Sequence, residues 1–152
     1  MLFLLDVLEH LPSHQGALAS AALAVRPGGL LLITVPALRT FWSENDVYAR
    51  HQRRYSRREL DTLAKSAGLI PVHSSYFMFL LSPLLFFSRL FWRGPADPSP
   101  EQVRNYLFRT HRTPPRAWNA FLAGILHLEN SLAKRITLPW GTSLLGVYRR
   151  PA

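Results

Sequence analysis

The chain has 152 residues, of which 48% are hydrophobic and 12% aromatic, and this size and composition are typical of one domain with a single buried core. It contains no cysteine, which excludes disulfides and thiolate zinc sites and predicts a cytoplasmic location. The formal net charge is +9, concentrated after residue 49, which fits a solvated basic surface, an anionic membrane face or an acidic substrate, while no motif indicates nucleic-acid binding.

The first part of the chain predicts a strand, a helix and a second strand. Leu2–Leu5 is a short apolar run that lacks the preceding basic residues of a secretory signal, so we expect a core strand. Ser13 is placed to cap a helix over residues 14–26, which Pro27-Gly28-Gly29 would end. Leu30–Val35 is almost continuously apolar, as in strands covered by helices on both sides.

The next part predicts a loop, a capped helix and a third strand. Residues 36–55 read as a loop. Ser56 and Glu59 have the spacing of a capping box at the start of a helix, and Gly68 can supply the left-handed residue that ends it. A strand near residues 69–77 follows. The strand-helix-strand-helix-strand order therefore predicts a doubly wound α/β sheet.

Two polar clusters directly follow predicted strands. They occupy residues 6–10 and 42–55. In open α/β sheets, ligands bind beyond the carboxyl ends of the strands. We therefore expect both clusters on one rim of the sheet, as parts of a single site.

The second half is less regular. Residues 77–92 are intensely apolar but shorter than the roughly 20 residues of a spanning helix, so we interpret them as a lid or an interfacial helix. They favour a hydrophobic acceptor or a peripheral membrane contact. A linker over residues 93–100, a helix beginning near Ser99, a helix over 115–135 and a strand over Thr142–Tyr148 complete the prediction. We expect a single domain over 1–152, with 78–137 as a helical insertion.

Four strings together closely resemble a known family. They are DVLEHLP (6–12), VRPGGLLLITVPA (25–37), FWSENDVYARHQRRYSRREL (41–60) and LPWGTSLLGVYRR (138–150). They resemble the C-terminal half of class I S-adenosylmethionine-dependent methyltransferases of the type 11/12 group. The resemblance implies a Rossmann-like fold and S-adenosyl-L-methionine as cofactor.

The resemblance does not extend to the cofactor-binding half of that family. The sequence contains no G-x-G, whereas the family holds its cofactor with a Gly-rich loop and an acidic residue. The chain therefore resembles a truncated domain. We expect an open sheet edge, an uncovered apolar face and poor solubility.

The first cluster combines two carboxylates and an imidazole. If a helical turn begins at Asp6, then Asp6, Glu9 and His10 share one face and could bind Mg²⁺. Ubiquinone-biosynthesis O-methyltransferases resemble this stretch, which implies a metal near the transferred methyl group. The alternative is that both carboxylates accept backbone N–H bonds while His10 is packed. The resemblance also places Leu5 and Asp6 against the methionine end of the cofactor.

The second cluster is expected to bind the acceptor. Its members are Trp42, Asp46, His51, Arg53, Arg54 and Tyr55. His51 is the preferred general base, with His10 as its competitor. Arg53 and Arg54 could clamp an anionic group of the substrate, or instead hold the loop to its own acidic residues. Tyr55 is expected to be a packing residue.

Together these features predict S-adenosylmethionine-dependent methyl transfer to a small, hydrophobic or lipid-linked acceptor. The alternative is a non-catalytic remnant or a basic membrane-associated module that keeps the half-fold without turnover. An upstream coding sequence with a Gly-rich loop would favour the enzyme.

Overall fold

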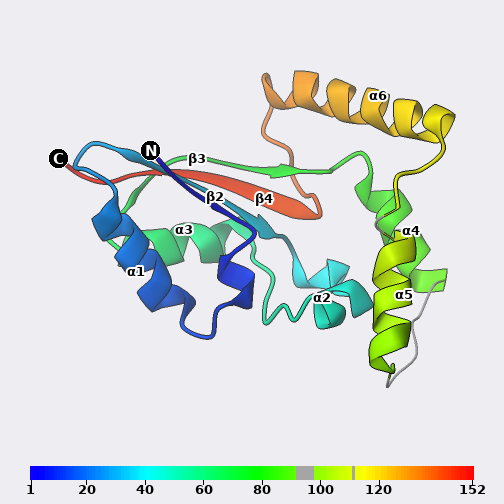
Figure 1. The fold of residues 1–152 in the computed structure, drawn as a ribbon. Helices are drawn as coiled ribbons and strands as arrows, with labels where there is room; N and C mark the ends of the chain where they lie inside the picture. Colours follow the sequence, from blue (N-terminus) through cyan, green and yellow to red (C-terminus); the bar gives the residue numbers. More distant parts are fainter. Residues whose placement is uncertain (92–97, 111) are drawn as a thin grey trace.

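A computed structural model describes residues 1–91, 98–110 and 112–152. Strands and helices follow one another through the first half, and in the described part of the chain a run of helices precedes the last strand (Figure 1). In chain order the elements are β1 (Leu2–Leu5), η1 (Leu8–His10), α1 (His14–Ala24), β2 (Leu30–Pro36), η2 (Arg39–Phe41), α2 (Glu44–Tyr48), α3 (Arg57–Ser66), β3 (Ile70–Phe77), α4 (Ser82–Phe91), α5 (Pro100–Thr110), α6 (Arg116–Ala133) and β4 (Ser143–Arg149).

The strands form one sheet in the order β1-β2-β4-β3. β1 pairs with β2 in parallel, whereas β4 runs antiparallel to both β2 and β3. The last strand of the chain therefore lies between the second and the third, and β1 forms one edge of the sheet. The α/β sheet and its final strand confirm the prediction.

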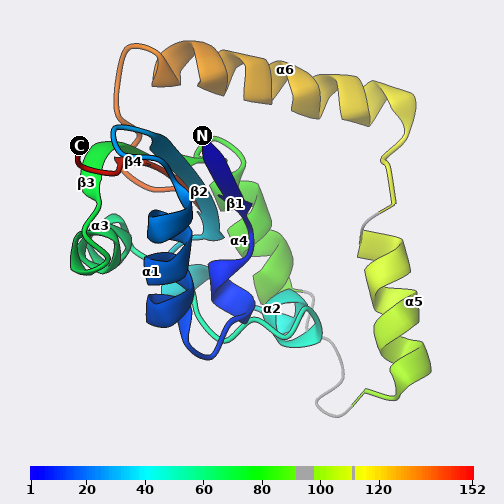
Figure 2. The same ribbon diagram turned by 60° about the vertical axis from the view of Figure 1, so that its left-hand side comes forward.

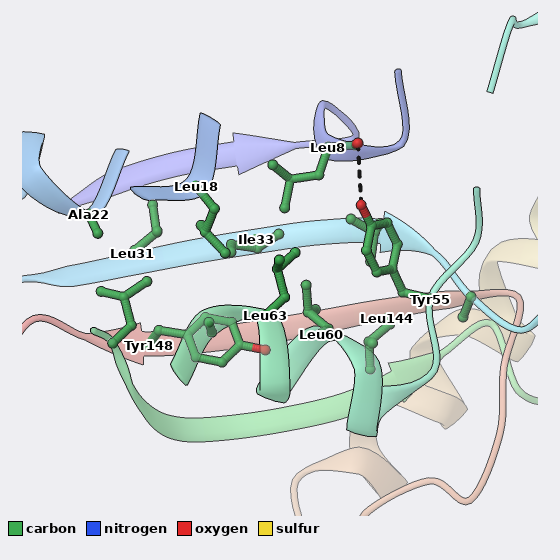
Figure 3. Close-up of a cluster of buried hydrophobic side chains, with 14 of the residues drawn as sticks. Leu8, Leu18, Ala22, Leu31, Ile33, Tyr55, Leu60, Leu63, Leu144 and Tyr148 are labelled. Carbon is green, nitrogen blue, oxygen red and sulfur yellow. Dashed lines mark hydrogen bonds between the residues drawn. The ribbon is translucent and has the colours of Figure 1, made fainter. Parts of the chain in front are cut away.

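Helices α1 and α3 cover the same face of the sheet (Figures 1 and 2). Leu18 of α1 and Leu60 of α3 pack in one core with Ile33 of β2 and Leu144 of β4 (Figure 3). A doubly wound sheet carries helices on both faces, and α1 and α3 lie on one of them. Right-handed crossovers that advance in one direction across a sheet place their helices on the same side.

The other face of β1 and β2 is only partly covered. Leu31 and Ile33 are fully buried, but Phe3 and Leu5 are each 54% exposed. The expectation that both faces of Leu30–Val35 are covered is therefore wrong, because burial alternates along the strand. The open edge and the uncovered apolar face that the truncated pattern predicts are both present.

Local capping explains where α3 begins and ends. The Glu59 carboxylate accepts hydrogen bonds from the backbone and the hydroxyl of Ser56, at 2.7 and 2.8 Å, which confirms the capping box. Gly68 follows the helix with φ +76°, as predicted. Ser13 is the N-cap residue of α1 but makes no side-chain cap bond, so its predicted role is not observed.

Helices α4, α5 and α6 lie between β3 and β4 in the chain. The buried Glu129 of α6 accepts a hydrogen bond of 2.8 Å from the backbone N–H of Leu80, which ties α6 to the segment before α4. Ser99 and Gln102 make the expected contacts at the start of α5. Most of the predicted linker lies outside the described residues. Across the described ranges, no helix is both long and apolar enough to cross a membrane.

Candidate functional site

The segments that follow β1 and β2 meet at one rim of the sheet. Because the two strands are parallel, their carboxyl ends lie side by side. Gln52 joins the segments, since its backbone N–H donates to the carbonyl of Glu9 and its side-chain amide donates to the carbonyl of His10, both at 2.8 Å. The predicted convergence of residues 6–10 and 42–55 is therefore observed.

Asp6 does not start a helical turn. Its φ is +52°, its backbone N–H donates to the carbonyl of Thr34 at 3.0 Å, and its carboxylate accepts from the Thr34 hydroxyl at 3.3 Å. The turn begins instead at Leu8. Asp6 is thus held against β2, and the shared face predicted for Asp6, Glu9 and His10 does not form.

Glu9 is a buried carboxylate without a polar partner. Its residue is 0% exposed, and neither carboxylate oxygen has a hydrogen-bond partner in the described part of the chain. Burial raises the pKa of Glu9 to about 7, and the nearby Asp6 adds to the shift. The alternative in which the Glu9 side chain accepts backbone N–H bonds is not observed as a hydrogen bond of normal geometry, although the backbone N–H of Glu9 itself partly offsets the rise of its pKa.

Asp46, in contrast, is buried and fully paired. Its two carboxylate oxygens accept hydrogen bonds from Arg54, at 2.8 and 3.0 Å, and further bonds come from the Ser43 backbone and from Nδ1 of His51. Burial alone would raise the pKa of Asp46, but the bonds from Arg54 and His51 outweigh it and lower that pKa. An ionised Asp46 requires that His51 donate through Nδ1, which leaves Nε2 free to accept a proton or bind an ion.

The two clusters bring Glu9, His10 and His51 together. Nε2 of His10 lies 4.0 Å from a carboxylate oxygen of Glu9. The rings of His10 and His51 have centroids 4.8 Å apart and an interplanar angle of 72°. One possible ligand atom from each of the three residues lies within 4.8 Å of the others. This set contains His51 in place of the predicted Asp6.

The two arginines of the loop hold the structure together. Arg54 is buried and, besides Asp46, donates to the carbonyls of Ala37 and Thr142, which favours the loop-holding alternative. Arg53 donates to the carbonyl of Leu11 at 2.8 Å. Both also border a pocket of about 310 Å³, whose lining residues are Arg39, Trp42, Gln52, Arg53 and Arg54.

Tyr55 and Ser43 complete the support of the rim. Tyr55 is 3% exposed, and its hydroxyl donates to the carbonyl of Leu8 at 3.3 Å (Figure 3), as expected for a packing residue. Ser43 was not recognised from the sequence, although Ser43 and Asp46 have the spacing of a capping box. That spacing could have predicted α2 within the segment read as a loop.

Comparison with known proteins gives one family match, which lies in the first half of the chain. Residues 2–74 match a family described as a methyltransferase domain. No curated protein matches the sequence closely enough to count as a relative.

Solved structures share the fold at low identity. The [4+2]-cyclase SpnF matches with a TM-score of 0.50 and 14% identity, over 99% of this chain and 50% of its own. Haemonchus contortus phosphoethanolamine N-methyltransferase 2, in complex with S-adenosyl-L-methionine, matches with a TM-score of 0.50 and 16% identity, over 99% of this chain and 33% of its own. The Bacillus halodurans protein BH2331, named as a candidate methyltransferase, matches with a TM-score of 0.50 and 12% identity, over 99% of this chain and 68% of its own.

These matches show the Rossmann-like methyltransferase fold predicted from the sequence. The chain spans about half the length of SpnF and a third of the Haemonchus enzyme. Since one match is named a cyclase, the fold alone does not fix the reaction.

Proposed function

We propose that this chain is part of a class I S-adenosylmethionine-dependent methyltransferase and provides the acceptor side of its active site. The fold and the family match over residues 2–74 support this proposal. The observation that carries the proposal is the meeting of Glu9, His10 and His51 beyond the carboxyl ends of β1 and β2. The acceptor we propose is small and hydrophobic or lipid-linked.

His51 is the proposed general base. Methyl transfer is an in-line displacement on a sulfonium, so the protein must align the acceptor and remove a proton when the nucleophile is a hydroxyl. Asp46 fixes the ring of His51 through Nδ1 at 2.9 Å, so that Nε2 can accept that proton. His10, whose side chain is 41% exposed, is the competing base.

The fit of the cofactor to this chain is partial. S-adenosyl-L-methionine supplies the electrophilic methyl group, and Leu5 and Asp6 lie at the rim where the resemblance places its methionine end. No G-x-G loop is present in the sequence to approach the rest of the molecule. This chain therefore forms one wall of the cofactor site, and we expect it to bind S-adenosylhomocysteine weakly when alone.

The surroundings of α4 support a hydrophobic acceptor. Leu84 and Phe87 are 57% and 56% exposed, and the ring of Phe86 lies 6.3 Å from that of Phe41 in η2. The apolar surface of α4 therefore adjoins the segment that follows β2. It supports either entry of an apolar acceptor at the rim or a peripheral membrane contact through residues 77–92.

The test begins with the coding sequence upstream of Met1. An in-frame strand, Gly-rich loop and acidic residue would define an extended chain, which is then titrated with S-adenosylhomocysteine by calorimetry. We expect binding to the extended chain, and methyl transfer that His51→Gln abolishes while the exposed His73→Gln leaves it unchanged. A folded extended chain that binds no S-adenosylhomocysteine would refute the proposal, and a stop codon directly upstream would favour the non-catalytic remnant.

A further inference from the structure

The buried carboxylate of Glu9 lacks a compensating cation. An unpaired buried carboxylate is costly because it loses its hydration without gaining a partner. The nearest fixed cation in this cluster, Arg54, already donates both of its paired bonds to Asp46. Glu9 is fully buried and neither of its oxygens has a hydrogen-bond donor among the described residues, so no hydrogen-bonded cation of the described part of the chain compensates its charge.

Two imidazoles converge on this carboxylate from different segments. His10 follows β1, whereas His51 comes from the loop after α2, and their rings meet edge to face with centroids 4.8 Å apart. The ligand atoms of Glu9, His10 and His51 lie within 4.8 Å of one another. If each of these atoms bonded to a common ion at about 2.1 Å, the atoms would lie about 3.0–3.5 Å from one another. Small side-chain rotations achieve this contraction.

His51 is oriented as metal-binding histidines are. Its Nδ1 is held by the Asp46 carboxylate, which Arg54 and Ser43 hold in turn. Metal-ligating histidines typically donate their other ring N–H to a carboxylate in this manner, which fixes the ring and increases the basicity of the ligating nitrogen. This arrangement leaves Nε2 of His51 available on the side of Glu9 and His10.

We propose that Glu9, His10 and His51 bind a divalent transition-metal ion, with Zn²⁺ as the best-suited probe. Two nitrogen donors and one carboxylate suit Zn²⁺, Fe²⁺ or Mn²⁺ better than Mg²⁺, which prefers oxygen. Three protein ligands leave a coordination position open, and the partial exposure of His10 gives it access to solvent. Binding depends on these side chains alone. An ion on Nε2 of His51 occupies the atom that the proposed function gives to the base, so the two roles of His51 exclude one another, and any role of the ion in activating the acceptor rests on the proposed function.

The experiment measures metal binding without cofactor. The chain, purified without a histidine tag and stripped with chelator, is titrated with Zn²⁺ and Mg²⁺ by calorimetry and with Co²⁺ by visible absorption. We expect a single Zn²⁺ site per chain, a Co²⁺ spectrum with nitrogen ligation, and little binding of Mg²⁺. Because no S-adenosylhomocysteine is present, the result is independent of the test of methyl transfer.

Variants decide whether these three residues form the site. Glu9→Gln, His10→Ala and His51→Ala should each abolish the Co²⁺ spectrum, and Asp46→Asn should weaken Zn²⁺ binding by about 10–100-fold. Glu9→Gln removes a buried unpaired charge, so it is expected to fold, which circular dichroism verifies. The exposed His127→Ala is the matched control. The proposal is overturned if folded Glu9→Gln and His51→Ala bind Zn²⁺ as the parent chain does, if His127→Ala alone loses it, or if the parent chain binds none.

Discussion

The Arg54→Met substitution tests whether the rim is held by a buried ion pair. Arg54 donates two bonds to Asp46, of 2.8 and 3.0 Å, and both residues are at most 6% exposed. Met keeps much of the apolar volume but leaves the Asp46 carboxylate buried beside its weaker donors. Removing one partner of a buried pair costs about 3–5 kcal/mol. For a chain of this length, that cost corresponds to a fall of roughly 6–20 °C in the melting temperature.

The measurement is urea unfolding followed by tryptophan fluorescence at low protein concentration. The control is Arg58→Met, since Arg58 is exposed on α3 and its loss should change the free energy of unfolding by no more than about 0.5 kcal/mol. The double variant Asp46→Asn with Arg54→Met should recover part of the loss, because it removes the unpaired charge. If Arg54→Met and Arg58→Met changed the free energy of unfolding equally, the structural role of the pair would be refuted. A role of Arg54 in substrate binding would then be favoured.

Three further predictions concern other parts of the chain. Leu5→Lys, on the open edge strand, should reduce self-association measured by light scattering, whereas Leu23→Lys, 73% exposed on α1, should not. Gly141→Ala should cost about 1–3 kcal/mol in urea unfolding, because a Cβ there would collide with a backbone carbonyl of β3. Gly124→Ala, with open space on α6, should instead stabilise the chain by roughly 0.5–1 kcal/mol. The pKa of Glu59 is lowered by hydrogen bonds at the start of α3, so its stabilisation is present above the unfolded pKa and is lost as pH falls through the folded pKa. Because Glu59 is exposed and solvent screens its charge, Glu59→Gln should lower the free energy of unfolding at neutral pH by no more than about 0.5 kcal/mol and lose this effect in acid, and a cost that persists unchanged in acid would contradict the assignment.

The elements that could be predicted are those whose signals are local. Helix α3 was found because Ser56 and Glu59 cap it, its apolar residues recur on one face, and Gly68 allows the left-handed turn that ends it. Each of these signals lies within the helix or next to it. The same is true of the short apolar runs that became β1 and β2, whose existence was correct even though their burial was not.

The features that could not be predicted depend on contacts distant in the sequence. That the two clusters share one rim could be predicted, but the meeting of His51 with Glu9 depends on the path of the loop, which Gln52 fixes through the carbonyls of Glu9 and His10 and which no local pattern indicates. Asp6 leaves the expected turn because Thr34 of the neighbouring strand binds it. The face on which α1 and α3 lie is likewise set by the direction of the crossovers rather than by the residues of the helices.

The support of the candidate metal site lies within this chain, whereas the support of a cofactor site does not. Glu9 and His10 sit on η1, which is fixed to the loop after β2 by Gln52 and by the hydroxyl of Tyr55. Neither of these connections uses the outer edge of β1, where Leu5 is half exposed. Metal binding and cofactor binding should therefore separate in this chain, with Zn²⁺ bound at its full affinity and S-adenosylhomocysteine bound weakly. An extended chain that gains cofactor affinity without a change in Zn²⁺ affinity would show that the two halves of the site are built independently, because the ligands of the ion and the residues that orient them are already in place here.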